Sequence, residues 1–511
     1  MAILDDITII GAPGDITSVL PNLRTGLARI GLELSQSKCA WLGPSAPPGP
    51  DPLPVVQSVK IGGITLPRGQ PQIDAATAVL ERATAHSRWA ITNLPLTCSV
   101  PLIKHCIIPS VVHLLRADAV PAALATHFDD TIHDLLASAL AIPAQSCHRL
   151  QLPVRFGGLG VPSLATSLAP AFVAHAATAI TTARCPGFLA PDTNPASIRF
   201  RFHAVRAQLN LGWDAGRLTH VCGTPPSHTP VPSPVQHTLV ELVYRTRALH
   251  AGIPLVAPPG ACGSWTGDTL NACATAASSL SDGAYALTVR THLGVPRPIP
   301  GPCLRCGTTS THPDHADRCP DLKGARTRRH NALAQALVAA AHAGIGVTVA
   351  TLETTMAGRM ADGSSRPLGR GAGHRRCDVS IATGAHTTYV EIKTLLGDAD
   401  DVVAIVRNTV QEYQAAGLDK PLVVAFATNG SYSSSTRELC QRLARDTHQE
   451  LLDISGRLAC TFAAASWDAV AQCHPHITPS SIPPTSTTQI PRITPSSARA
   501  SRLASGPGAP R

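Results

Sequence analysis

The amino-acid sequence predicts a multidomain protein. A short α+β region and a helical region come first, followed by a compact cysteine and histidine cluster and a C-terminal α/β domain. The chain has 511 residues, enough for about three domains of ordinary size. Hydrophobic residues make up 44% of it, so most of the chain can bury a core. Along the chain, the hydrophobic pattern changes from short β-branched runs to long helical stretches, and then to strands that alternate with helices.

Charge and cysteine content narrow the class of protein. The formal net charge is +9, from 42 Lys and Arg against 33 Asp and Glu. Clustered basic side chains displace counterions from phosphates, so a basic chain fits a nucleic-acid partner, although charge alone is weak support. Fifteen cysteines, an odd number in a long chain, disfavour a secreted disulfide scaffold. Reduced thiols in the nucleus or cytoplasm are the expectation.

Neither a signal peptide nor a membrane segment is expected. Asp5 and Asp6 interrupt the first apolar run, which disfavours a secretory signal. The uncharged stretch at 163–183 is rich in Ala and Thr and contains Pro170 and His175. This composition is typical of a buried helix and not of a membrane span. The sequence therefore predicts an intracellular protein with no membrane partner.

The first seventy residues predict a small α+β region. Two β-branched runs in residues 1–11 surround Asp5 and Asp6, which indicates a hairpin with the acids at its bend. An amphipathic helix is expected at 17–30, with Thr17 as its N-cap. Its apolar stripe comprises Val19, Leu20, Leu23, Leu27 and Ile30. Residues 61–66 predict one more short strand, with a glycine bend.

The order of these elements resembles the second half of a reverse transcriptase palm. It runs Ala-Ile-Leu-Asp-Asp, hairpin, helix, Gly-Leu-Glu-Leu, Lys38 and the glycine-bent strand. The resemblance implies that Asp5 and Asp6 bind Mg²⁺ for nucleotidyl transfer and that Lys38 assists the leaving pyrophosphate. A solvated turn is the alternative for the acidic pair. Leu-Pro-Val-Arg-Phe-Gly-Gly-Leu-Gly at 152–160 resembles the segment after the thumb in non-LTR retrotransposon proteins.

The palm resemblance is partial. The family's first palm strand carries another metal-binding Asp, which would lie before Met1. We therefore expect a C-terminal fragment of a polyprotein whose polymerase half is incomplete and inactive alone, with dNTP as a partner only if the polymerase were complete. The helical pattern from about 75 to 215 would then be the thumb and connector. Proline-rich linkers follow at 224–235 and 253–260.

Four residues have the spacing of a structural zinc site. Cys303-x2-Cys306-x8-His315-x3-Cys319 offers three sulfurs and one nitrogen, with Gly307 placed for a knuckle turn. Such a closed site would be structural and could contact nucleic acid. His312 is an alternative to His315 as the fourth ligand. The other alternative is that the four residues form no site and the cysteines are simply reduced. Similar CCHC clusters precede the endonuclease in the retrotransposon family named above.

Alternating strands and helices follow the cluster. Strands are expected near 346–352, 377–382, 387–393 and 421–428, and helices at 324–343, 400–416 and 434–448. A two-residue turn at Gly384-Ala385 suits a type II′ hairpin, in which the numbers of paired residues sum to 769. Asp378 then lies across from Glu391 on a face without core residues, with Cβ atoms about 5 Å apart. Such like charges are unfavourable unless a cation such as Mg²⁺ bridges them.

Asp378, Glu391 and Lys393 resemble the PD-(D/E)XK nuclease motif, with Cys377 where the pattern most often has proline. The resemblance implies two Mg²⁺ ligands and a lysine that orients the attacking water. It also makes Glu353 an additional candidate ligand, and Gln411 and Tyr413 candidate contacts to the scissile phosphate. Further candidate phosphate contacts are the pairs Arg329-His330 and Arg375-Arg376. An exposed hairpin with chance charges is the alternative.

The expected organisation has six parts: a partial palm (1–70), a helical thumb and connector (71–215), a linker and helical segment (216–300), a zinc knuckle (301–320), a restriction-endonuclease-like domain (321–472) and a disordered tail (473–511). The expected function is Mg²⁺-dependent nicking of target DNA for target-primed reverse transcription of element RNA. The alternative is an inactive nucleic-acid-binding remnant, and a stand-alone junction resolvase is a weaker third.

Overall fold

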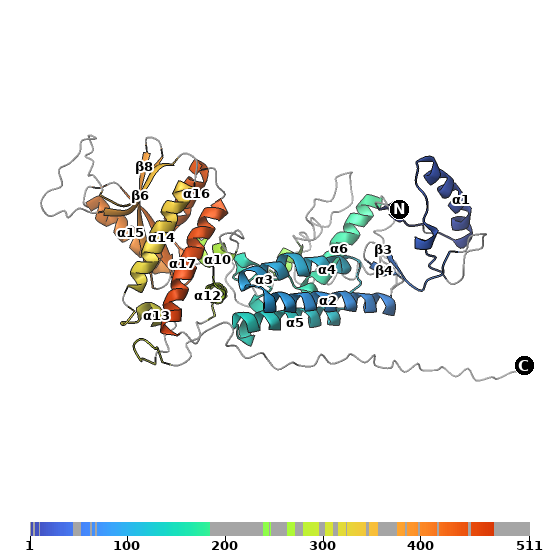
Figure 1. Ribbon diagram of the computed structural model, residues 1–511, viewed down its shortest axis with the longest axis horizontal. Coiled ribbons are helices and arrows are strands. Elements are labelled where there is room, and N and C mark those ends of the chain that lie inside the picture. Colours follow the sequence, from blue (N-terminus) through green and yellow to red (C-terminus); the bar gives the residue numbers. More distant parts are fainter. Residues whose placement is uncertain are drawn as a thin grey trace, which may run out of the picture.

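The structure of the chain is a computed structural model (Figure 1). It describes residues 2–3, 6–9, 11–43, 53–61, 64–66, 69–183, 239–244, 246, 263–270, 280–295, 302–309, 315–322, 324–343, 347–355, 376–383, 386–396, 399–415, 418, 420–447 and 451–474. Within these residues, Figure 1 shows a mostly helical body and a second body in which helices cover a β-sheet. The mixed helix and sheet architecture confirms the expected fold class at this coarse level. The predicted tail beyond residue 474 lies outside the described residues.

The N-terminal hairpin forms, but the helix after it starts earlier than predicted. β1 (Ala2–Ile3) pairs antiparallel with β2 (Asp6–Ile7), with Ile3 opposite Asp6. α1 (Pro13–Arg29) begins with a proline in its first turn, where the missing N–H costs nothing. Thr17 is therefore inside the helix, and its hydroxyl bonds to the carbonyls of Pro13 and Gly14 instead of capping.

The apolar stripe of α1 is not buried. None of the described side chains of α1 is buried, and Val19 and Ile30 are 46% and 71% exposed. The predicted strand at 61–66 is a second small hairpin. β3 (Val59–Ile61) and β4 (Ile64–Leu66) pair antiparallel, and the predicted glycine bend at 62–63 lies outside the described residues.

The helical body confirms the predicted helical pattern as far as residue 183. Its helices are α2 (Gln70–Asn93), α3 (Leu96–Leu102), α4 (Ile108–Arg116), α5 (Ala122–Leu140) and α6 (Leu164–Ala183). A π-helical turn, Ile103–Ile107, joins α3 to α4. α6 begins where buried Asp129 accepts hydrogen bonds from the amides of Leu164 (2.8 Å) and Ala165 (3.0 Å). This capping of free amides explains why the helix begins there.

One described helical stretch, Leu96–Arg116, has the length and hydropathy of a membrane-crossing helix. In the structure, 44% of its most apolar window is buried inside the protein. Core helices of this composition pass the same test, so the finding is weak evidence for a membrane span.

The second body is built on a six-stranded mixed sheet with the order β5-β10-β9-β8-β7-β6. Its strands are β5 (Gly263–Ser264), β6 (Val347–Thr355), β7 (Arg376–Thr383), β8 (His386–Leu395), β9 (Leu422–Ala427) and β10 (Ser431–Tyr432). β8 and β9 run parallel and the other neighbouring strands run antiparallel. The chain between β8 and β9 forms α15 (Ala399–Ala415), the crossover helix that a parallel pair needs.

Helices cover both faces of this sheet (Figure 1). α14 (Ala325–His342), α16 (Ser434–Thr447) and α17 (Leu451–Cys473) pack on the face that presents Val379, Val390 and Phe426. α15 covers the opposite face, where Val402 packs against Leu395 and Ala425. The predicted order of helices and strands from 324 to 448 is confirmed.

α17 was not predicted, because 434–448 was expected to be the last helix, and that expectation is wrong. α17 contacts α10, α12, α14 and α16, so it is buried on several sides. Such a helix lacks the single apolar stripe by which amphipathic helices are recognised.

The segment expected to be a linker and helical segment (216–300) also contributes to this body. β5 extends the sheet edge by pairing with β10, and α10 (Trp265–Leu270) packs against α17. α12 (Asp282–His292) joins the two bodies. Gly283 lies against Trp467 of α17, whereas Asp282 accepts a hydrogen bond of 2.7 Å from the amide of Leu96 in the helical body.

Candidate functional site

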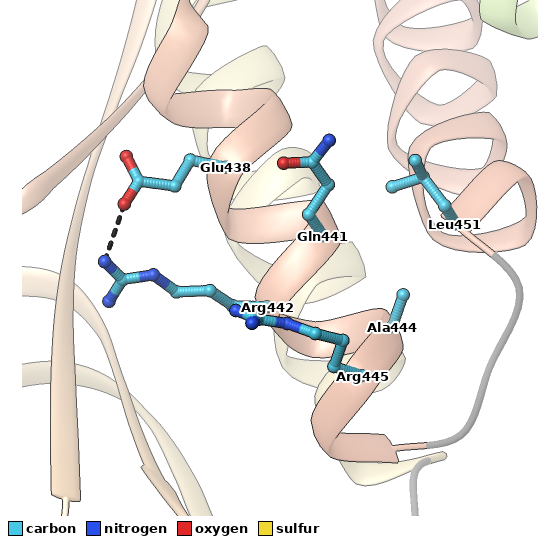
Figure 2. A pocket seen from close by; sticks show the side chains of 6 residues that line it. All are labelled: Glu438, Gln441, Arg442, Ala444, Arg445 and Leu451. Carbon is cyan, nitrogen blue, oxygen red and sulfur yellow. Dashed lines mark hydrogen bonds and ion pairs between the residues drawn. The ribbon is translucent and has the colours of Figure 1, made fainter.

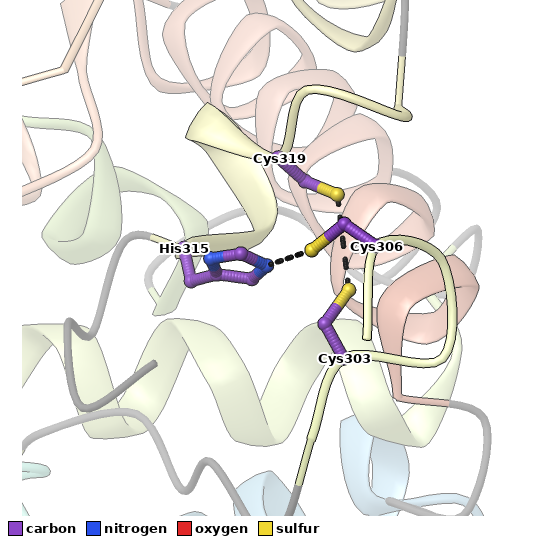
Figure 3. Close-up of side chains that lie close together, drawn as sticks. All are labelled: Cys303, Cys306, His315 and Cys319. Atoms are coloured by element: carbon purple, nitrogen blue, oxygen red, sulfur yellow. Dashed lines mark hydrogen bonds between the residues drawn. The ribbon is translucent and has the colours of Figure 1, made fainter. Parts of the chain in front are cut away.

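The four predicted metal ligands converge (Figure 3). All four ligand atoms of Cys303, Cys306, His315 and Cys319 lie within 4.8 Å of one another. Cys303 Sγ is 3.7 Å from Cys319 Sγ, and Cys306 Sγ is 3.3 Å from His315 Nε2. A tetrahedron with Zn–S bonds of about 2.3 Å and Zn–N bonds of about 2.0 Å has edges of roughly 3.5–3.8 Å, close to both distances. The cluster can therefore hold a metal such as zinc. The rival His312 lies outside the described residues.

The local backbone prepares two of the cysteines, Cys303 and Cys306, for a metal, whereas burial raises the pKa of Cys319. Gly307 has a φ of +67°, a left-handed conformation that glycine adopts without strain, and its amide donates to the carbonyl of Cys303 at 2.8 Å. Burial raises the pKa of Cys303, but hydrogen bonds from the amides of Cys306 and Arg305 outweigh it and lower that pKa. Hydrogen bonds from Thr308 lower the pKa of Cys306. Both changes favour the thiolate, which is the form that binds metal.

The cluster is docked on the sheet-containing body. Cys303 and Cys319 are buried in one apolar cluster with residues of α12, α14 and α17, namely Leu287, Ala325, Ala469, Val470 and Cys473. The amide of Leu304 donates to the carbonyl of Cys473 at 3.0 Å. α14, which carries His330, begins at Ala325, a few residues after Cys319. Metal binding would therefore stabilise the first turn of this helix.

The strand register that brings the acidic residues together is the predicted one. The numbers of the paired residues Val379↔Val390, Ile381↔Thr388 and Thr383↔His386 all sum to 769, as predicted, and the expected turn residues 384–385 lie outside the described residues. The paired residues end at Val379↔Val390, directly beside Asp378 and Glu391, and the next contact between the strands runs from the amide of Ile392 to the side chain of Asp378. Val379, Ile381, Val390 and Ile392 lie in the core, as the alternation predicts.

The second face is not open, which corrects the expectation of a face without core residues. α15 covers it, and Ser380 and Glu391 are only 8% and 9% exposed. Cys377, Tyr413 and Leu418 form a separate apolar cluster on this side. Burial raises the pKa of Cys377 to about 11, so that thiol stays protonated and acts as a packing group.

Each carboxylate has partners from more than one element. Lys393 Nζ bonds to Oε1 of Glu391 at 2.5 Å, and the hydroxyl of Tyr413 donates to Oε2 at 2.8 Å. The amide of Ile392 donates to Oδ2 of Asp378 at 2.6 Å, and His330 Nε2 lies 3.0 Å from the same oxygen. The hydrogen bond to Asp378 raises the pKa of His330. An acidic site with a lysine and a histidine therefore forms at one end of β7 and β8.

Two of these contacts were not foreseen, since His330 and Tyr413 were expected to touch phosphates. Instead, His330 reaches Asp378 from α14, and Tyr413 is 3% exposed and reaches Glu391 from α15. Arg329 is 1% exposed, so its side chain does not reach a phosphate at the surface, which corrects that expectation. No sequence spacing indicates these contacts, because they join segments far apart in the chain.

The remaining predicted residues of the acidic site are spread out. Glu353 lies in β6, where the pairs Leu352↔Val379 and Thr354↔Cys377 place it beside Asp378. Gln411 is exposed and lines a groove of about 520 Å³ between α15 and α16, two residues from Tyr413 and on another side of α15. Arg376 begins β7, and Arg375 lies outside the described residues.

The acidic pair at the N-terminus is described only in part. Asp6 lies in β2, and Asp5 lies outside the described residues. Lys38 is exposed in a short 3₁₀ helix, Gln36–Lys38, and no described contact joins it to the hairpin.

A shallow surface hollow of about 550 Å³ lies between α16 and the start of α17. Figure 2 shows the residues that line it. Among them, Arg442 forms an ion pair with Glu438, with 2.6 Å between Nη2 and Oε1. None of the acidic-site or cysteine-cluster residues lines this hollow, so it is separate from both candidate sites.

No family model matches the chain, and no curated protein matches it. A proposal of function therefore has to rest on the geometry of the two sites.

Proposed function

We propose that the chain is a Mg²⁺-dependent DNA endonuclease that nicks target DNA, and that its metal-binding cluster is a structural zinc knuckle. One observation carries the nuclease proposal. Asp378 and Glu391 adjoin Val379↔Val390, the last residue pair between β7 and β8, and Lys393 bonds to Glu391. Two carboxylates and a lysine at the end of paired strands are the groups that metal-assisted phosphodiester hydrolysis needs.

Asp378 and Glu391 would hold the Mg²⁺, because carboxylate oxygens are ligands that this ion prefers. The bound ion would polarise the phosphate and lower the pKa of a water molecule. Lys393 is partly exposed, with 31% of its side chain accessible, and can orient that water or stabilise charge on the phosphate. Tyr413 holds the Glu391 carboxylate in place.

We further propose that this nuclease belongs to a non-LTR retrotransposon polyprotein and nicks DNA for target-primed reverse transcription of element RNA. The order of acidic hairpin, helical body, zinc-binding cluster and acidic site supports this proposal. In it, residues 1–70 are part of a polymerase palm, with Asp5, Asp6 and Lys38 as its catalytic groups.

Plasmid nicking tests the nuclease proposal. We expect purified protein to convert supercoiled plasmid to the open-circular form with Mg²⁺ and not with EDTA. Asp378→Ala and Lys393→Ala should lower the rate by roughly 10²-fold or more. Asp401→Ala, which removes an exposed acid of α15, is the matched control and should keep wild-type activity. Nicking that persists in Asp378→Ala would exclude this active site.

An inactive nucleic-acid-binding protein is the second candidate, and one observation favours it. Both oxygens of Glu391 and one oxygen of Asp378 already have protein partners, which compete with a metal ion. In that case the wild-type protein binds DNA and nicks no plasmid at any Mg²⁺ concentration.

A further inference from the structure

Lys104 occupies an unusual position in the helical body. It lies in the π-helical turn Ile103–Ile107, a type of distortion often found at functional sites. Its amino group rests on Gly160, where a Cβ would lie 2.9 Å from Nζ and 3.1 Å from Cε. Gly160 also has a φ of +74°, so glycine is required there both for the backbone and for the lysine.

The loop under Lys104 is rigid. The amide of Gly157 donates to the carbonyl of Val154 at 3.0 Å, that of Gly158 to Pro153 at 3.2 Å, and that of Gly160 to Leu152 at 2.7 Å. These amides are used within the loop, so a ligand here would be held by side chains. The loop therefore serves as a fixed support for Lys104.

Other basic groups gather around the same loop. Arg149 donates to the carbonyl of Leu293 at 2.6 Å, next to Gly294, where a Cβ would lie 3.1 Å from the guanidinium. Arg155 follows Val154 in the loop and pairs with Glu241 at 2.7 Å. His292 Nε2 bonds to the carbonyl of Val154 at 3.0 Å. Lys104, Arg149 and Arg155 are thus three basic side chains around one loop, and of these Arg155 is paired with a carboxylate.

Among the described residues, no carboxylate forms a hydrogen bond or an ion pair with Lys104. Burial lowers the pKa of Lys104, so the site disfavours the charge that it carries. A partly buried cation without a counterion destabilises a fold, so a ligand that brings negative charge to it would stabilise the folded state.

We propose that Lys104, supported by Gly160 and flanked by Arg149 and Arg155, binds a backbone phosphate of a nucleic-acid strand at the junction of the helical body and α12. The inference rests on the proposed function in one respect, that the chain acts on nucleic acid. A phosphate would supply a negative charge that no described carboxylate gives to Lys104, and the absence of a side chain at Gly160 leaves room for the lysine.

Duplex binding under varied salt tests the site without requiring nicking. A short fluorescein-labelled DNA duplex of random sequence is titrated with full-length protein in EDTA, and anisotropy gives the affinity at several salt concentrations. We expect Lys104→Met to lower affinity roughly 3- to 10-fold and to reduce the slope of log K against log salt by about 0.9, the loss of one phosphate contact. Lys60→Met, which removes an exposed lysine of β3, is the matched control.

The inference would be overturned if Lys104→Met kept the affinity and the salt slope of the wild-type protein, or if Lys60→Met lost as much affinity as Lys104→Met. Either result would leave the nuclease proposal intact. Loss of plasmid nicking in Asp378→Ala with unchanged duplex binding separates the two sites. If inorganic phosphate bound to the wild-type protein and not to Lys104→Met, and the two proteins had equal duplex affinity, the site would bind free phosphate and not nucleic acid. That result would overturn the proposal. Thermal unfolding checks the fold, and Lys104→Gln serves as a second variant if Lys104→Met does not fold.

Discussion

The hydroxyl of Tyr413 donates a hydrogen bond of 2.8 Å to Oε2 of Glu391, although the two residues lie on different elements, α15 and β8. Lys393 holds the other carboxylate oxygen at 2.5 Å. Burial, and then the hydrogen bond to Glu391, raise the pKa of Tyr413, so its hydroxyl keeps the proton that it donates. The Glu391 carboxylate is therefore oriented by the protein before any ligand binds.

Tyr413→Phe should lower stability and weaken metal binding at the proposed site. Removing the hydroxyl leaves a buried carboxylate oxygen without its partner, at a cost of about 1–3 kcal/mol. We expect a lower thermal midpoint, and a Mg²⁺ concentration for half-maximal nicking that is several-fold higher. Tyr389→Phe is the control, because the hydroxyl of Tyr389 makes no hydrogen bond among the described residues. Equal thermal midpoints for Tyr413→Phe and wild type would contradict the role of the hydroxyl.

The cysteine cluster should bind one zinc ion per chain. Native mass spectrometry and elemental analysis of the purified protein measure this ratio. Cys319→Ser should lose the metal and unfold at a lower temperature, because the cluster shares an apolar core with α14 and α17. Cys98→Ser removes an exposed thiol of α3 and should retain both the zinc and the stability. Full zinc content in Cys319→Ser would exclude this ligand set.

His292 predicts a loss of stability in mild acid. Burial lowers its pKa from 6.5 to about 4 in the folded protein. Below pH 6.5 the unfolded chain therefore takes up a proton that the folded chain accepts only near pH 4. The free energy of unfolding should be intact above pH 6.5 and fall towards pH 4, by roughly 3 kcal/mol in all.

His292→Gln should remove this dependence, since the amide can still bond to Val154 but does not titrate. Urea unfolding at several pH values between 4 and 8 measures the difference. His86→Gln, an exposed histidine on α2, should keep the wild-type pH profile. Parallel profiles for wild type and His292→Gln would show that this residue does not cause the effect.

Two glycine substitutions should act in opposite directions. At Gly283 in α12 a Cβ would lie 2.1 Å from a ring carbon of Trp467, so Gly283→Ala should force α12 away from α17 and cost about 1–3 kcal/mol. At Gly26 in α1 nothing lies within 4 Å, so Gly26→Ala should stabilise by about 0.5–1 kcal/mol. Denaturant unfolding gives both values. Equal effects at the two positions would mean that the contact of α12 with α17 is not tight.

Local patterns in the sequence were sufficient for the parts whose contacts are close in the chain. The spacing of Cys303, Cys306, His315 and Cys319 predicted a cluster that does converge. Alternation around a two-residue turn predicted the register of β7 and β8, because a slip of one residue would have turned Val379 and Val390 away from the core. Short loops and side-chain periodicity determine such features without help from distant segments.

Only the tertiary structure decided which distant segments come into contact. α15 covers the face that bears Glu391, and Tyr413 and His330 reach the two acids from separate helices. β5 joins the sheet from the expected linker and helical segment, by pairing with β10. α17 is buried on several sides, so its sequence lacks a single apolar stripe. Periodicity reports which side of one element is apolar, whereas the packing of whole elements decides which side chains meet across that face.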